Sequence, residues 1–277
     1  MTEFLDIAGK KIAYDLTGAG PLVVLAHGMG DSRHSYRFVA PALVAAGYRV
    51  ANVDIRGAGE SSLGWDGYSR TDIAGDLVAL VRHLGGPAVI MGQSISGGAA
   101  TIAAATAPEL IAGILELAPF TRKQSVSLSD FGVKRVRAGS TQLGLTMMLG
   151  SLSAWKKYLD VAYPTKPRDW DAEMTRIETK MSEPGRMKAL QAMTRTTPAD
   201  AGAQLPNVTC PVLIIEGTLD PDWADPRAEG EKIIADLPAG LGELVVLDGA
   251  GHYPHAQMPD EVLARALPFL STTLTSA

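Results

Sequence analysis

Short apolar runs alternate with amphipathic stretches along most of this chain. The runs have the composition of strands that are buried on both faces of a parallel sheet. They are Leu22–Ala26, Tyr48–Val53, Ala88–Met91, Gly113–Leu117, Val212–Glu216 and Leu244–Leu247. Helix-like stretches lie between them or follow them, over Tyr36–Ala46, Thr71–Leu84, Ile95–Ala107, Arg227–Leu237 and Pro259–Leu270. This alternation predicts an α/β fold with a mostly parallel central sheet.

The first residues follow a different pattern. Two short segments, Phe4–Ala8 and Lys11–Leu16, are joined by Gly9, and this arrangement predicts a β-hairpin. Further along, Asp72, Pro226 and Pro259 stand where three of the predicted helices begin, and each residue type is a common start signal.

The alternation breaks between Thr121 and about Pro206, where the pattern is helical and no strand is evident. We therefore predict a core domain of residues 1–120 and 207–277, interrupted by a helical cap of residues 121–206 that covers one edge of the sheet. The cap contains Trp155, Trp170 and most of the methionines. These side chains either pack inside the cap or line a substrate pocket, and some could do both. The pocket is an alternative because methionine thioethers adapt to irregular shapes.

Composition narrows the class of protein. The chain has 277 residues, 46% of them hydrophobic and 20% charged, with a net charge of −5. This acidic balance argues against a nucleic-acid partner, which requires a basic face. Neither an apolar run of about 18 residues nor a signal-peptide pattern is visible, so we expect no membrane contact. A single cysteine, Cys210, is typical of a reducing compartment, and we expect a cytoplasmic monomer or homodimer.

The segment Gly92–Gly98 directly follows the predicted strand Ala88–Met91 and precedes an alanine-rich helix pattern. Small residues allow the sharp, strained strand-to-helix turn known as a nucleophile elbow, which exposes the side chain at its tip. That side chain is Ser94, and serine requires a base and an oxyanion site to act as a nucleophile.

Four further motifs follow predicted strands: His27–Gly30, Asp54–Ser61, Gly217–Asp220 and Gly249–His252. With the elbow, they make the chain resemble the α/β-hydrolase superfamily over nearly its whole length, in particular its capped, esterase-like serine hydrolases. The resemblance implies an α/β-hydrolase fold with a helical cap. One departure is Ser96, which stands where the family's elbow usually has glycine, and we expect this small residue to be tolerated.

The resemblance implies a catalytic triad in the order Ser94, Asp220, His252. His252 would act as the general base and Asp220 would hold the imidazole in one tautomer. Rivals remain for two of these roles. His255 is an alternative base, and three carboxylates are alternatives to Asp220: Asp222, Asp225 and Glu116.

The same resemblance implies an oxyanion hole made by the backbone N–H groups of Met29 and Ile95. Side chains or backbone around this hole would bind a small-molecule substrate. The candidate substrate-binding residues are Gly28, His34, Trp155 and Met148.

The predicted function is hydrolysis of a carboxylic ester or lactone of a small to medium apolar substrate through an acyl-enzyme. Members of the superfamily with the same triad also include carbon–carbon bond hydrolases, amidases and cofactor-free haloperoxidases. A small-molecule binding protein on a hydrolase scaffold is an alternative from another class. The sequence shows no H-E-x-x-H, C-x-x-C or phosphate-binding glycine loop, so we expect neither a metal nor a cofactor.

Overall fold

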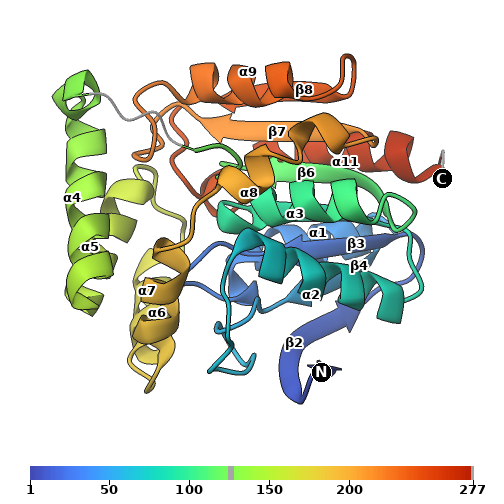
Figure 1. Ribbon diagram of the computed structural model, residues 1–277, viewed down its shortest axis with the longest axis horizontal. Coiled ribbons are helices and arrows are strands. Elements are labelled where there is room, and N and C mark those ends of the chain that lie inside the picture. Colours follow the sequence, from blue (N-terminus) through green and yellow to red (C-terminus); the bar gives the residue numbers. More distant parts are fainter. Residues whose placement is uncertain (124–127, 276–277) are drawn as a thin grey trace.

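One eight-stranded sheet runs through the molecule (Figure 1). The computed structural model describes residues 1–123 and 128–275, and the strand order is β1-β2-β4-β3-β5-β6-β7-β8. The strands are β1 (Thr2–Ile7), β2 (Lys10–Thr17), β3 (Leu22–Ala26), β4 (Arg49–Val53), β5 (Ala88–Gln93), β6 (Ile111–Leu117), β7 (Val212–Gly217) and β8 (Gly242–Leu247). Only the pairs β1–β2 and β2–β4 are antiparallel. The predicted hairpin and the mostly parallel sheet are confirmed.

Helices cover both faces of the sheet. The helices of the sheet domain are η1 (Arg33–Tyr36), α1 (Val39–Ala45), α2 (Arg70–His83), α3 (Ile95–Thr106), α9 (Pro226–Asp236), α10 (Pro254–Gln257) and α11 (Pro259–Thr275). The α2, α3 and α9 helices pack on one face, and α1 and α11 pack on the other. Successive side chains of a strand point to opposite faces of the sheet. Val24 therefore lies in the hydrophobic cluster with α2, α3 and α9, and Val23 in the cluster with α1 and α11. This double burial explains the apolar runs.

Three helix starts differ from the prediction, and that of α9 differs by one residue, at Pro226. The predicted helix Tyr36–Ala46 is shorter in the structure, because α1 begins only at Val39 and Tyr36 ends the preceding η1. Pro41 is thereby the third residue of α1, in the first turn, where a missing N–H is tolerated. The α2 helix begins at Arg70, one residue earlier than predicted, and its N-cap is Ser69. Asp72 is the third helical residue and completes a capping box with Ser69.

Between residues 121 and 206 the described residues form helices and no strand. These helices are η2 (Leu128–Gly132), α4 (Lys134–Leu149), α5 (Leu152–Ala162), α6 (Trp170–Met181), α7 (Arg186–Thr194), α8 (Ala199–Gly202) and η3 (Leu205–Asn207). In Figure 1, α4 to α7 lie beyond the carboxyl ends of the parallel strands. Residues 124–127 of the predicted cap lie outside the described residues. The exact boundaries of the cap stay a prediction.

The α5, α6 and α7 helices share a hydrophobic cluster of their own. Trp155, Leu159 and Ile177 pack there against Tyr253 and Ala256, which follow β8. The helical segment is thereby fixed over the strand ends where the predicted site residues lie.

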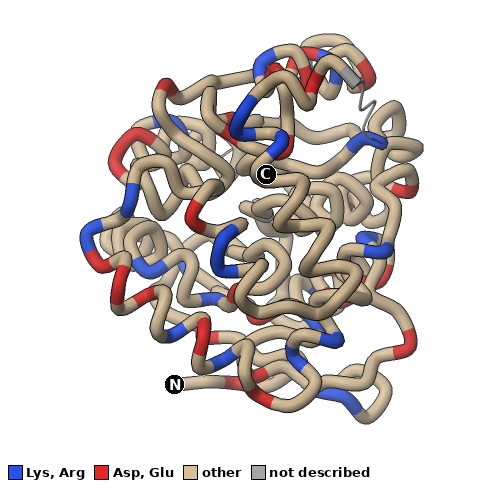
Figure 2. The backbone as a smooth tube through the Cα atoms, turned by 90° about the vertical axis from the view of Figure 1, so that its left-hand side faces the viewer, with Lys and Arg blue, Asp and Glu red and all other residues tan. Residues whose placement is uncertain are grey.

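In the backbone view of Figure 2, positions of Lys and Arg alternate with positions of Asp and Glu, and neither sign is confined to one part of the view. Among the described residues, no helix has the length and apolar character needed to span a bilayer.

Candidate active site

Ser94 lies at the tip of the turn between β5 and α3. Its backbone angles, φ 54° and ψ −119°, are strained for a residue with a side chain. Two backbone hydrogen bonds hold the turn: Ser94 N donates to Leu117 O at 3.0 Å and Phe120 N donates to Ser94 O at 3.1 Å. Gly92 is required because a Cβ there would lie 2.3 Å from Ser96 O. The turn has the geometry predicted for an elbow, and Ser94 lines a cavity.

The Ser96 hydroxyl ties this elbow to the loop after β3. It is fully buried and donates to His27 O at 2.6 Å. The His27 ring then shapes the same loop, with Nδ1 2.6 Å from Gly28 O and Nε2 accepting from Ile55 N at 3.2 Å. Serine at this position therefore adds a cross-link that glycine could not make, and its hydroxyl is engaged away from the cavity.

His252 follows β8 and is held by its backbone from two sides. Its N–H donates to Ala162 O at the end of α5, at 3.0 Å, and its carbonyl accepts from Gln93 Nε2 at 2.9 Å. Gly251 permits this approach, because a Cβ there would lie 2.2 Å from Ala162 O. The glycine-rich sequence before His252 thus allows the helical segment and the elbow to fix the same histidine.

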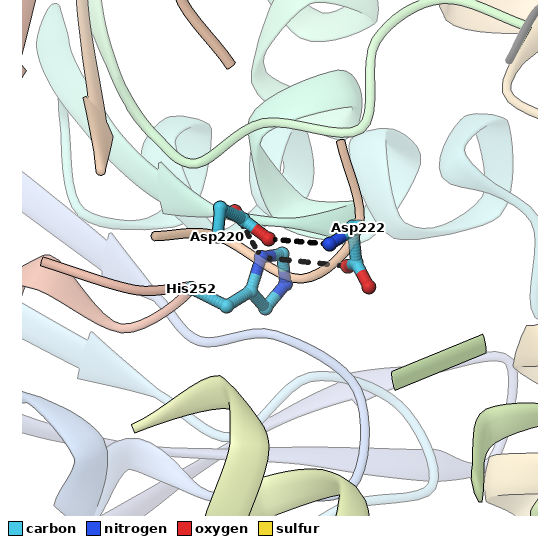
Figure 3. A group of neighbouring side chains, drawn as sticks. All are labelled: Asp220, Asp222 and His252. Atoms are coloured by element: carbon cyan, nitrogen blue, oxygen red, sulfur yellow. Dashed lines mark hydrogen bonds and ion pairs between the residues drawn. The ribbon is translucent and has the colours of Figure 1, made fainter. Parts of the chain in front are cut away.

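Two carboxylates flank the imidazole of His252 (Figure 3). Asp220 Oδ2 lies 2.7 Å from His252 Nδ1, and Asp222 Oδ2 lies 3.5 Å from the same nitrogen. Burial lowers the pKa of His252, but the charges of Asp220 and Asp222 and the hydrogen bond to Asp220 outweigh it and raise that pKa to about 9. With Nδ1 bonded to Asp220, Nε2 is the nitrogen left to act as a base.

Asp222 is also linked to the helical segment. The hydroxyl of Tyr158, on α5, lies 3.0 Å from each carboxylate oxygen of Asp222. Burial and the charge of Asp220 raise the pKa of the Asp222 carboxyl to about 6, although His252 and Tyr158 act in the opposite direction. Of the rivals for the acid position, Asp222 is therefore the one that contacts the imidazole along with Asp220.

The structure places the other two rival carboxylates elsewhere. Asp225 is the N-cap of α9, where its side chain accepts from Ala228 N at 3.0 Å. Glu116 is buried on β6 and accepts hydrogen bonds from Thr101 and Thr121. Neither contacts His252.

Two other histidines have structural partners. His255, the alternative base, is fully buried and stacked on Tyr36, with Nε2 2.6 Å from Ser35 Oγ. His34, a predicted substrate-binding residue, does not line the cavity around Ser94. Its Nδ1 lies 2.9 Å from a carboxylate oxygen of Glu173 on α6, so it joins the sheet domain to the helical segment.

The cavity around Ser94 and His252 has a volume of about 380 Å³. Trp155 lines it, as predicted, and packs over Gly30 with its Nε1 donating to Gly30 O at 3.3 Å. Gly28 lies behind Ser94 without lining the cavity. Met148 is 72% exposed at the end of α4 and is not part of the cavity wall, so its predicted role is wrong. Met193 of α7 is the methionine of this segment that lines the cavity.

The backbone N–H groups of Met29 and Ile95 have no hydrogen-bond partner among the described residues. Ile95 is the first residue of α3, where helical N–H groups are unpaired, and Met29 lines the cavity. Both groups are available to a developing oxyanion, as the predicted oxyanion hole requires.

Asp220, Asp222 and His252 also form a cluster whose ligand atoms lie within 4.8 Å of one another, close enough to hold a metal ion. A metal there would compete with the hydrogen bond between His252 Nδ1 and Asp220, because the bond uses the same atoms. These three side chains could therefore form the hydrogen-bonded pair of a triad or hold a metal ion, but they could not do both at the same time.

Several residues that contribute to the site were not predicted from the sequence, among them Gln93, Tyr158 and Arg70. Gln93 holds His252, Tyr158 holds Asp222, and Arg70 lines the cavity from the start of α2. Gln93 is adjacent to Ser94, and that adjacency was a usable signal. Tyr158 and Arg70 reach the site only through tertiary packing, and no local pattern identifies them.

A sequence profile of the alpha/beta hydrolase family matches residues 23–266, which is most of the chain. The chain belongs to the alpha/beta hydrolase family. A curated member, 2-(acetamidomethylene)succinate hydrolase from Mesorhizobium japonicum, is 28% identical over 96% of this chain and 94% of its own length.

Two solved structures of this family share the fold. An esterase from Exiguobacterium antarcticum superposes with a TM-score of 0.80 at 19% identity, covering 98% of this chain and 100% of the esterase. An enol-lactonase from Burkholderia xenovorans LB400 superposes with a TM-score of 0.77 at 20% identity, covering 97% and 100%. The chain is thus an alpha/beta hydrolase in sequence and in fold.

Proposed function

We propose that this alpha/beta hydrolase cleaves a carboxylic ester or lactone of a small to medium, largely apolar substrate through an acyl-enzyme. The observation that carries the proposal is the convergence of Ser94 and His252 on one cavity, with Asp220 bonded to the far side of the imidazole. In this proposal Ser94 is the nucleophile, His252 the general base and Asp220 the orienting acid.

The reaction proceeds in two halves. His252 Nε2 takes the proton of the Ser94 hydroxyl as Oγ attacks the carbonyl carbon, and the negative charge on the carbonyl oxygen is stabilised by the N–H groups of Met29 and Ile95. The imidazolium then protonates the leaving alkoxide, and the acyl group stays on Ser94. In the second half, His252 Nε2 takes a proton from water as the water oxygen attacks the acyl carbon. The bond from that carbon to Ser94 Oγ then breaks, the imidazolium returns the proton to Oγ, and the acid leaves.

The cavity limits the substrate. A volume of about 380 Å³ lies toward the lower end of the usual range for small-molecule sites, and Met29, Leu143, Trp155 and Met193 give it apolar walls. For this reason we propose that the acyl chain of the substrate is short to medium in length. We further propose that the protein is a monomer or homodimer that acts in the cytoplasm on a free small molecule. Burial raises the pKa of the Cys210 thiol to about 11, so this side chain is an unreactive thiol and takes no part in the proposed chemistry.

The test is hydrolysis of p-nitrophenyl acetate, butyrate and octanoate by the wild type and by Ser94→Ala. Turnover that falls at least about 1,000-fold in Ser94→Ala supports the proposal. Ser96→Gly is the matched control, because the neighbouring hydroxyl donates to His27 O and we expect turnover to persist without it. Wild type that hydrolyses none of these esters, or equal turnover by Ser94→Ala, contradicts the proposal.

A further inference from the structure

Arg70 is a buried cation in the wall of the cavity that also contains Ser94 and His252. It is the first residue of α2 and is 2% exposed. Its Nε donates to Phe120 O at 2.7 Å, and Phe120 N in turn donates to Ser94 O at 3.1 Å. The backbone of Phe120 therefore links the guanidinium of Arg70 to the backbone of Ser94 through two hydrogen bonds.

The guanidinium of Arg70 has no anionic partner in the part of the chain that the structure describes. Nη1 donates to the Thr196 hydroxyl at 3.3 Å, and no bond from Nη2 is found there. Asp200 contributes a favourable charge, but its carboxylate accepts from Thr71 and Ala201. By contrast, Arg56 is also buried and forms a bidentate pair with Asp76.

The fold leaves room for Arg70 at this position. Its side chain crosses α3 at Gly98, where a Cβ would lie 2.7 Å from Arg70 Cδ and 2.8 Å from Phe120 O. Glycine, one turn after Ser94, thus lets the guanidinium lie against the elbow helix and reach the cavity.

The other charges of the cavity do not neutralise Arg70. Lys123, an exposed residue, adds a second cation to the lining, and the Asp222 carboxylate faces His252 and Tyr158. Burial lowers the pKa of Arg70 to about 10, so the group is still a cation at neutral pH. An unpaired buried cation is unfavourable, and an anionic ligand that enters the cavity relieves that cost.

We propose that Arg70 binds a carboxylate group of the substrate, so that the preferred ester or lactone carries a free carboxylate next to an apolar chain. A planar carboxylate matches a single guanidinium and its unused N–H groups. This inference rests on the proposed function, because it names the substrate class of the same site.

The test compares esters that differ in charge. Monomethyl glutarate and methyl valerate have nearly the same shape around the ester, and only the first carries a carboxylate. The acetyl ester of para-hydroxybenzoate and phenyl acetate form a second pair, with the charge on the alcohol side. The proteins are wild type, Arg70→Met, Arg70→Lys and Arg49→Met. Arg49 is the matched control, because it too donates to a backbone carbonyl, Leu84 O at 2.8 Å, and lies outside the cavity.

We expect wild type to prefer the charged ester of at least one pair. In Arg70→Met, the ratio of kcat/KM for charged over neutral ester should fall by about 100-fold, mainly through KM, since truncating one partner of a buried charge pair has effects of this order. Arg70→Lys should recover part of the ratio, and Arg49→Met should keep it. A merely structural role for Arg70 would lower both kcat/KM values together.

The outcomes separate the two claims. Turnover of the neutral esters through Ser94, with no charge preference or with an unchanged ratio in Arg70→Met, overturns the carboxylate site and leaves the hydrolase. If wild type cleaves no ester, the proposed function fails, and calorimetry with glutarate decides the binding site. Binding by wild type but not by Arg70→Met supports it, whereas equal binding or none overturns it.

Discussion

Asp222 lies beside His252 as a second carboxylate, 3.5 Å from the nitrogen that Asp220 already accepts from. Two neighbouring negative charges stabilise the imidazolium, and the pKa of His252 is raised to about 9, against the lowering effect of burial. A general base acts only when it is neutral. We therefore expect kcat/KM for an ester to rise with pH as His252 loses its proton, with a midpoint near that value.

Asp222→Asn removes one of these charges and keeps an oxygen for the Tyr158 hydroxyl. With less stabilisation of the imidazolium, the pKa of His252 falls, and the acid limb of the pH profile of kcat/KM moves to lower pH. The measurement is this profile for wild type and variant with p-nitrophenyl butyrate. An unshifted limb would mean that Asp222 does not act on the imidazole, and Asp225→Asn, at the α9 cap, is the control that should leave the limb in place.

At the same scale, the structure brings some of the predicted site residues together and places others elsewhere. Ser94, Asp220 and His252 each follow a strand of one parallel sheet, so their convergence at one edge follows from topology. Met148 and His34 depend on how the helical segment docks, and composition does not specify docking. Met148 points to solvent, and His34 pairs with Glu173.

Among the elements, α2 begins with a capping box in which Ser69 accepts from Asp72 N and Asp72 accepts from Ser69 N. The box fixes the first turn of the helix and with it the backbone of Arg70. Ser69→Ala should lower the free energy of unfolding by about 1 kcal/mol, because one N–H of the first turn loses its acceptor.

Urea unfolding of the two proteins measures this difference. Ser153→Ala is the control, since Ser153 is an exposed residue inside α5, where alanine is the better helix former. Equal midpoints for Ser69→Ala and wild type would show that the capping box contributes nothing to stability.

Element positions were largely predictable because most strands are buried on both faces and their apolar runs end where the burial ends. The bounds of β1 to β8 all match the prediction within two residues at each end, whereas α1 begins three residues later and α11 ends five residues later than predicted. The late start of α1 places Pro41 in the first turn of the helix, where proline is tolerated, and the apolar pattern before it does not show where that turn begins.

For the whole molecule, stability depends on pH through carboxyl groups that are buried in the sheet, Glu116 and Glu216. Glu116 on β6 is fully buried, and burial raises the pKa of its carboxyl to about 7, against the lowering hydrogen bonds from Thr101 and Thr121. The folded protein thus holds a proton that an unfolded glutamate loses near 4.5. The stabilising contribution is complete below that pH and is lost as the pH rises through about 7.

Glu116→Gln, which is uncharged at every pH, should therefore be more stable than wild type at pH 8, by roughly 3 kcal/mol, and similar to it at pH 4. The Tm of both proteins across this pH range measures the effect. Glu216 is also buried, and burial raises the pKa of its carboxyl, so the stability of the variant still depends on pH to some extent. Glu243→Gln, on the exposed side of β8, is the control. Parallel Tm curves for Glu116→Gln and wild type would contradict the buried-acid account.

The arrangement of sheet and helices was predictable at the level of the whole molecule, and the cavity was not. Its shape arises where Trp155 and Met193 of the helical segment meet Ser94 and Phe120 of the sheet domain, and these contacts join residues far apart in the sequence. Packing of that kind leaves no periodic signal in either segment.

The most direct test of the account is covalent labelling of the nucleophile. Wild type, Ser94→Ala and His252→Ala are treated with diethyl p-nitrophenyl phosphate, which phosphorylates serines activated by a base, and the adduct is located by peptide mass spectrometry. The account predicts one adduct on Ser94 in wild type, none in Ser94→Ala, and much slower labelling in His252→Ala. An adduct on another residue, or equal labelling without His252, would contradict it.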